Sequence, residues 1–264
     1  MYQKFLLLSL FLCIMAWNQN PLCQGNLPTL TTKTSLYIEH NPIDIDSNND
    51  FSTLGFSGSG TVNDPYIIEN LNITDVTTNL ITIRDTTVYF TINNCFLNSA
   101  YGTRYNGIFL RNVQYCTIIH NIITNCYSGI DIGSSNNNTI AYNSISHNNV
   151  SGIVSYDLKN SVISNNEIVN NIGTGIGGIG ISRGIHMDSS DSNILFNNTI
   201  LNNSDSGIFL AFNNNNNKIM NNTCQKNNFG IYLSSSHKNN LSGNIVSFNS
   251  DSGILLCDSS WNKL

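Results

Sequence analysis

Charged residues are scarce in this chain. Asp, Glu, Lys and Arg make up 10% of its 264 residues, against about a quarter in an average protein. The 11 Lys and Arg residues form no cluster, so the sequence lacks the basic surface with which nucleic-acid-binding proteins neutralise phosphates. We therefore expect no nucleic-acid partner. Asn, Ser and Thr take the place of charge, with 47 Asn in all, while 40% hydrophobic residues suffice for a core.

Long apolar runs are missing after the N-terminal segment. There, Lys4 precedes an apolar run from Phe5 to Trp17, which is shorter than a membrane span and typical of a signal peptide. The small-x-small triplet at 23–25 predicts cleavage after Gly25, with an uncleaved anchor as the alternative. We expect residues 1–25 to be a signal peptide, with no further transmembrane segment. The protein is then secreted, periplasmic or at the cell surface.

Helical periodicity is also missing, and a repeat stands in its place. A string that starts with Gly-Ile recurs seven times at intervals of 22, 23, 32, 23, 23 and 23 residues. Counted from each glycine, apolar residues stand at offsets one and three, then near offsets eleven and sixteen. A spacing of two within each short segment predicts strands, so each unit holds three of them. The seven strings start at Gly107, Gly129, Gly152, Gly184, Gly207, Gly230 and Gly253.

Asparagine stands at the polar corners between these strands, near offsets nine, fourteen and nineteen. Asn121, Asn143 and Asn166 share offset fourteen, for example. Asn tolerates the left-handed backbone that a sharp corner needs. Identical Asn side chains one turn apart can also hydrogen-bond in a ladder. The run of five asparagines at 213–217 is therefore read as a corner with one inserted residue.

Three strands and three corners in 22–23 residues describe one coil of a parallel β-helix. A single coil cannot bury enough apolar surface, so stability requires stacking. The stretch GSGTVNDPYIIENLNI (58–73), followed by the Gly-Ile-x-Leu and Asn-x-Ile units, resembles right-handed parallel β-helix proteins of the NosD-like family. The resemblance covers about residues 56–264. It implies the right hand of the coil and an exported protein grouped with carbohydrate-binding and sugar-hydrolysis domains.

This organisation predicts three regions. Residues 1–25 are the signal peptide, residues 26–60 form an N-terminal cap with entry strands, and residues 61–264 form the β-helix. The last unit stops at offset eleven, which predicts an open or truncated edge at the C-terminal end. Further coils or a partner could cover that edge.

A stripe of side chains should point outward from the first strand of each coil, at offsets two and four. Rigid aromatic rings can stack on sugar rings, and neighbouring polar groups can bind hydroxyls. We therefore predict a ligand-binding face for polysaccharide or another cell-surface ligand. The alternative is that these rings stabilise neighbouring strands or are covered by a loop or partner. The candidate ligand-binding residues are Phe109, Asp131, Tyr156, His186, Phe209 and Tyr232.

Signals for catalysis are weak. His186 and Asp188 share a face and are candidates for a base and the group that orients it. Asp131 and Asp188 lie two coils apart, roughly 10–12 Å, beyond the usual range for paired glycosidase carboxylates. The nine extra residues of the long interval fall around 171–183, either before a strand at Gly184, which we favour, or after one at Gly175. The G-x-G-x-x-G match in this stretch precedes no helix, so we expect no nucleotide site.

Metal and disulfide signals are missing as well. NosD-like proteins are associated with copper, but no two of the five histidines share a face at ligand spacing. We predict no metal and no cofactor. No two of the mature cysteines share an offset in adjacent coils, so we predict no disulfide among them. These cysteines are Cys95, Cys116, Cys126, Cys224 and Cys257.

Three functions remain open from the sequence. The first is an exported β-helix that binds polysaccharide or another cell-surface ligand without turnover. The second is a polysaccharide lyase or hydrolase that acts at the same face with His186 and Asp188, so whether the chain is an enzyme stays undecided. The third is a non-binding structural spacer at the cell surface.

Overall fold

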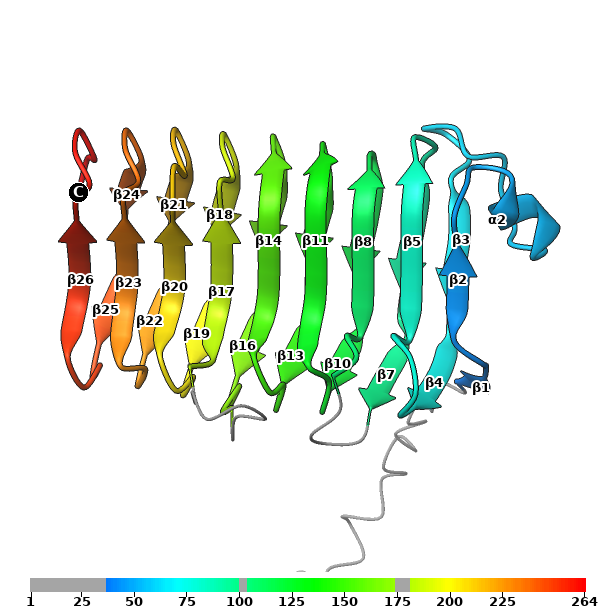
Figure 1. The fold of residues 1–264 in the computed structure, drawn as a ribbon, viewed down its shortest axis with the longest axis horizontal. Coiled ribbons are helices and arrows are strands. Elements are labelled where there is room, and N and C mark those ends of the chain that lie inside the picture. The colour runs from blue at the N-terminus through cyan, green and yellow to red at the C-terminus, as the bar shows by residue number, and fades with distance from the viewer. Residues whose placement is uncertain (1–36, 100–103, 174–180) are drawn as a thin grey trace, which may run out of the picture. The chain divides into compact units, whose positions relative to one another are not determined.

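The protein folds as a stack of three parallel sheets, and each turn of the chain adds one strand to each sheet (Figure 1). The computed structural model describes residues 37–99, 104–173 and 181–264. Within those ranges, two sheets have nine strands and the third has eight. This arrangement confirms the all-β parallel β-helix with three short strands per coil. In the same residues, no helix is long and apolar enough to cross a membrane.

The three sheets follow the chain in a fixed order. Sheet 1 holds β1 (Ile38–Glu39), β4 (Leu71–Asp75), β7 (Phe96–Ser99), β10 (Ile122–Thr124), β13 (Ser144–Ser146), β16 (Glu167–Val169), β19 (Thr199–Leu201), β22 (Thr223–Gln225) and β25 (Ile245–Ser247). Sheet 2 holds β2 (Ile43–Ile45), β5 (Ile81–Thr86), β8 (Ile108–Val113), β11 (Ser128–Asn136), β14 (Ser151–Lys159), β17 (Arg183–Asp188), β20 (Ser206–Ala211), β23 (Phe229–Ser234) and β26 (Ser252–Cys257). Sheet 3 holds β3 (Tyr66–Glu69), β6 (Phe90–Asn93), β9 (Cys116–Ile119), β12 (Thr139–Ala141), β15 (Val162–Ser164), β18 (Ile194–Phe196), β21 (Lys218–Met220) and β24 (Asn240–Ser242).

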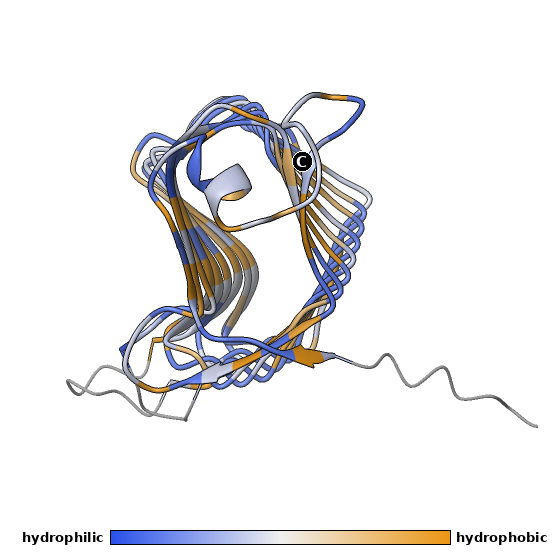
Figure 2. Ribbon diagram, turned by 90° about the vertical axis from the view of Figure 1, so that its right-hand side faces the viewer, coloured by the Kyte–Doolittle hydropathy of each residue, from blue (hydrophilic) through white to orange (hydrophobic). Residues whose placement is uncertain are grey.

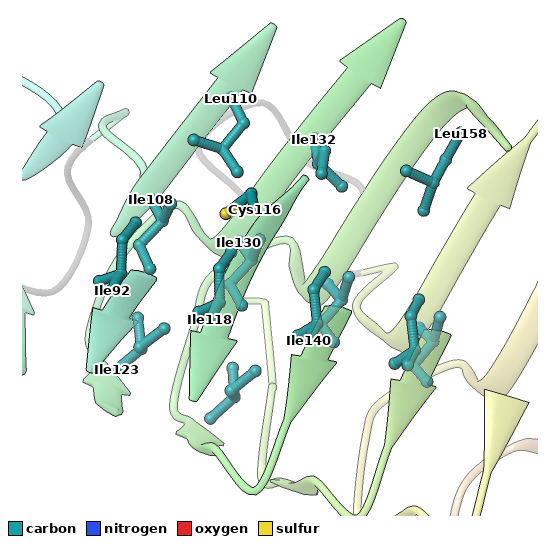
Figure 3. Close-up of a cluster of buried hydrophobic side chains, with 14 of the residues drawn as sticks. Ile92, Ile108, Leu110, Cys116, Ile118, Ile123, Ile130, Ile132, Ile140 and Leu158 are labelled. Carbon is teal, nitrogen blue, oxygen red and sulfur yellow. The ribbon is translucent and has the colours of Figure 1, made fainter. Parts of the chain in front are cut away.

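The core consists of apolar rows that run from coil to coil. In sheet 2, Ile108, Ile130 and Ile153 pair in register, and all three are fully buried. In sheet 3, Ile118 pairs with Ile140 in the same way (Figure 3). Because strand side chains alternate between faces, the apolar offsets turn inward together and the intervening residues turn outward.

The recurring glycine marks the closest approach of neighbouring coils. A Cβ atom at Gly207 would lie 2.6 Å from the carbonyl oxygen of Gly230 and 3.0 Å from the amide nitrogen of Asn227. The glycines of the preceding coils meet the same obstacle, a carbonyl of the following coil. A side chain at this position therefore cannot fit without separating two coils.

The long repeat interval is resolved by the pairing of β14 with β17. Ile153 pairs with Ile185, so the strand starts beside Gly184, as favoured from the sequence. The extra residues lie between Asn171, which joins a corner ladder, and Arg183 in β17. The G-x-G-x-x-G match at 175–180 lies outside the described residues.

Asparagine ladders occupy the corners, as the sequence predicts. The side-chain amide of Asn143 donates to the amide oxygen of Asn166 at 3.0 Å and to the carbonyl of Ile118 at 3.0 Å. Asn166 repeats the pattern with Asn198. The ladder therefore satisfies buried backbone groups that the corners would otherwise leave unpaired.

The left-handed corner residue is the one before each ladder asparagine, which corrects the expectation that one residue serves both purposes. Asn165 and Asn197 have φ of 54°, while the ladder residues Asn166 and Asn198 that follow them are not left-handed. In the 213–217 run the inserted residue produces two left-handed positions in succession, Phe212 and Asn213. Asn fills both positions at some corners, whereas residues such as His120 and Tyr142 take the left-handed position at others.

The two ends of the stack differ. At the N-terminal end, the helix α2 (Asp50–Thr53) lies across the opening (Figure 2). Its Phe51 is buried, with ring centroids 4.9 Å from Tyr66 and 5.1 Å from Phe90. At the other end, the inward-facing Ile254 and Leu256 of β26 remain 40% and 37% exposed, because no described rung follows them.

Candidate ligand-binding face

The outward side chains of sheet 2 form two parallel rows, which we call the outer face. Strand pairing places each row in register across seven coils, as the repeat predicts. The first row contains Phe109, Asp131, Val154, His186, Phe209, Tyr232 and Leu255. The second contains Arg111, Gly133, Tyr156, Asp188, Ala211, Ser234 and Cys257.

The outer face also reaches two coils further than the repeat predicts. Asp44 and Thr82 continue the first row, and Arg84 continues the second. The repeat search does not find these residues, because the strands of their coils do not begin with Gly-Ile. Thr82 follows Ile81 as Phe109 follows Ile108, so the apolar spacing alone could have located this coil.

Aromatic rings form a ladder in the C-terminal half of the outer face. The ring of Phe209 lies 5.2 Å from His186 and 4.8 Å from Tyr232, with interplanar angles of 33° and 48°. Phe229 adds a further contact with Tyr232 at 5.4 Å. The rings are half-buried and pack against one another at tilted angles, so they present edges more than flat faces to a ligand. Tyr156 is 56% exposed beside them.

An arginine that the sequence analysis passed over supports this ladder. The guanidinium of Arg183 lies 4.2 Å from the centroid of the Phe209 ring. Its Nε donates to Asp205 at 3.0 Å, and both side chains are about one-fifth exposed. Arg183 stands just before the repeat glycine, where the preceding coil has Ser151. A charge at a position that four of the other six coils fill with serine is the signal that could have identified it.

A second arginine cluster lies nearer the N-terminal end. Arg111 pairs with Asp131 at 2.8 Å and lies 4.4 Å from the centroid of Phe109. Asn106 donates to the other carboxylate oxygen of Asp131 at 3.4 Å. A Cβ atom at Gly133 would lie 2.9 Å from the Arg111 guanidinium, so this glycine provides the space in which Arg111 lies.

The two catalytic candidates lie on the same face but make separate contacts. His186 stacks on Phe209, and Asp188 accepts a hydrogen bond from the Ser189 hydroxyl at 3.2 Å. Within the described ranges, no hydrogen bond joins His186 to Asp188. Burial, together with the charge of Arg183, lowers the pKa of His186 to about 4. His186 is therefore neutral at pH 7 and a weak base.

Three surface hollows of about 420–460 Å³ in the described part of the chain are lined by residues at the corners of the coil. One of about 460 Å³ is lined by His237, Lys238 and Trp261, together with Asp191 and Ser260. Trp261 is 82% exposed there. The outer face is an open surface, so it suits a long ligand that lies along the coils better than a small molecule that needs enclosure.

Two family models match consecutive parts of the chain. Residues 52–179 match the right-handed β-helix region, and residues 178–264 match the periplasmic copper-binding protein NosD. No curated protein matches the chain.

Solved structures share the fold at low identity. A periplasmic alginate epimerase, AlgG, matches with a TM-score of 0.63 and 18% identity, over 75% of this chain and 50% of that one. DFA-IIIase from Arthrobacter chlorophenolicus A6, without its lid and in complex with GF2, matches with a TM-score of 0.58 and 16% identity, over 86% and 62%. The chain thus spans about half the length of the epimerase, and these likenesses establish the fold alone.

The residues that the structure describes do not fit a copper site. In the part of the chain that the structure describes, no three His, Cys, Asp or Glu side chains converge as metal ligands do. His186 packs on Phe209, and His120 stacks on Tyr142. Nδ1 of His237 lies 2.9 Å from the Ser260 hydroxyl.

The two family matches together cover residues 52–264, and the three sheets continue through both parts without a break. The chain is therefore a right-handed parallel β-helix repeat protein that is NosD-like over residues 178–264.

Proposed function

We propose that this protein is exported and binds a polysaccharide along the outer face of sheet 2. The observation that carries the proposal is the aromatic ladder His186–Phe209–Tyr232, which Arg183 and the rigid coil hold in place. Rungs repeat every 4.8 Å or so along the axis. A polymer of sugar rings has a comparable repeat and can contact several coils at once.

The chemistry of the face supports a sugar ligand. Ring edges and the exposed Tyr156 ring supply apolar surface for the C–H groups of a sugar. The hydroxyls of Tyr156 and Tyr232 and the carboxylate of Asp188 supply hydrogen-bonding groups for its hydroxyls. The carbohydrate-active neighbours of the same fold, alginate epimerase and DFA-IIIase, agree with this class of ligand, and the periplasmic names agree with export.

A glycan array with the wild type and three variants tests the proposal. The wild type should bind at least one polysaccharide, and Tyr156→Ala and Phe209→Ala should each weaken that binding about tenfold. Phe196→Ala is the matched control, because Phe196 lies outward on β18 of sheet 3 and is 37% exposed. Loss of binding in the control, or retention in both face variants, would refute the outer face as the site.

The enzymatic alternative needs His186 or Asp188 to transfer a proton. The low pKa of His186 and its separation from Asp188 give it no positive support. Release of shorter products from any glycan on the array, abolished by His186→Ala, would favour a lyase or hydrolase. A protein that binds no glycan would favour the structural spacer.

A further inference from the structure

The two arginines of the outer face, Arg84 and Arg111, and the adjacent Arg183 are each paired with carboxylates. Arg84 pairs with Asp44 at 2.8 Å and with Asp46 at 2.6 Å. Arg111 pairs with Asp131 at 2.8 Å, and Arg183 pairs with Asp205 at 3.0 Å. The positive charges are therefore neutralised within the protein before any ligand arrives.

Two of these guanidinium groups are also covered by rings. Arg111 lies on Phe109 and Arg183 lies on Phe209, at 4.4 and 4.2 Å from the ring centroids. Each guanidinium keeps N–H groups that its aspartate does not use, but its charge is already balanced, so an anionic group of a ligand would meet an ion pair and not an uncompensated cation. The arginines thus position rings and do not offer free cations.

The remaining ionisable groups of the face add no positive charge. Asp188 has the Ser189 hydroxyl as a partner and no cationic partner among the described residues. His186 is neutral at pH 7. The three arginines (84, 111 and 183) and the five aspartates (44, 46, 131, 188 and 205) on and beside the face carry a net charge of −2, and the Lys159–Asp157 pair of β14 adds no net charge.

From this charge pattern we infer that the ligand is an uncharged polysaccharide and not an acidic one. The inference rests on the proposed function and specifies its ligand class. A uronate polymer carries one carboxylate per sugar and would meet like charge without a free cation in return. A neutral polymer needs only hydroxyl partners and apolar contact, which the face provides. This ligand class differs from alginate, the polymer in the name of the epimerase AlgG, which shares the fold.

The test compares two polymers that differ only in charge. The best-binding polysaccharide from the array is paired with its counterpart of the same backbone. For a neutral binder this counterpart is made by oxidising the primary alcohols to carboxylates, and for an acidic binder by reducing the carboxylates to alcohols. Binding is measured calorimetrically with chelator present, so that no divalent cation bridges polymer and protein. The neutral member should bind about tenfold more tightly at about 20 mM salt, and the gap should narrow at about 200 mM.

Asp188→Asn provides a second readout. Removal of the carboxylate without a cationic partner should strengthen binding of the acidic member several-fold and narrow the gap between the two polymers. Equal affinities, or tighter binding of the acidic member, would overturn the inference while leaving glycan binding by the outer face intact. Failure of every glycan to bind would instead refute the proposed function, and the inference with it.

Discussion

Replacement of Asn198 by alanine should destabilise the protein more than replacement of its neighbour Asn197 by glycine. Asn198 is 1% exposed and sits in the middle of a corner ladder. Its side chain donates to the carbonyl of Ile163 and to the amide oxygen of Asn222, both at 2.9 Å. It also accepts from the backbone and side-chain amides of Asn166, both at 3.0 Å.

The alanine variant loses all four bonds at once. The backbone N–H of Asn166 and the amide groups above and below would remain buried without these partners. Each buried group left unsatisfied costs about 1–3 kcal/mol, and water can reach some of them, so we expect a total loss of about 3–6 kcal/mol. Asn197 is exposed and left-handed, with φ of 54°, a conformation that glycine adopts without strain. Asn197→Gly should therefore change stability by less than about 1 kcal/mol.

Equilibrium unfolding in urea, followed by far-ultraviolet circular dichroism, measures both variants against the wild type. The slope of the transition must be compared as well as its midpoint, because a repeat array can lose one block of coils before the rest. A loss at Asn198→Ala no larger than that at Asn197→Gly would show that the ladder does not stabilise the corners.

Two further predictions concern single positions in sheet 2. Gly207→Ala should lower stability by about 1–3 kcal/mol, because the new Cβ meets the Gly230 carbonyl; an unchanged thermal midpoint would contradict the close approach of these coils. His186 has a lowered pKa, so the unfolded chain binds its proton first, and stability should fall by about 1–3 kcal/mol as the pH drops from about 6.5 to about 4. His186→Gln should remove that part of the pH dependence in urea titrations, and an unaltered dependence would show that His186 is not buried as a neutral group.

The repeat in the sequence predicted the strand register, because residues one repeat apart in a solenoid lie side by side on neighbouring coils. Gly-Ile strings at 22–23 residues placed Phe209 beside Tyr232 without knowledge of any other contact, and the strand pairing agrees. The same reasoning placed the long interval before Gly184. Fold and rows were therefore readable from the sequence alone.

Side-chain contacts between coils were harder to predict from the sequence. Arg183 and Asp205 occupy different offsets in their units, so no periodic comparison brings them together, although they lie 3.0 Å apart. The tilt of the Phe209 ring depends on side-chain torsion angles, which spacing does not determine. The first two coils lack the glycine start, and a search by that string passes over them.

The sequence also does not show which residue of an Asn-Asn pair is left-handed at the corner and which one hydrogen-bonds in the ladder. Both residues of a pair such as 197–198 are polar and recur together, so the sequence cannot distinguish them. The backbone angle and the burial do: Asn197 is left-handed and exposed, and Asn198 is buried in the ladder.

A crystal structure of the protein with the polysaccharide that the array identifies is the most direct test of the proposed binding face. The account predicts sugar rings along sheet 2, in contact with Phe209, Tyr232 and Tyr156. A polymer bound in the corner hollow beside Trp261, with the outer face empty, would contradict it.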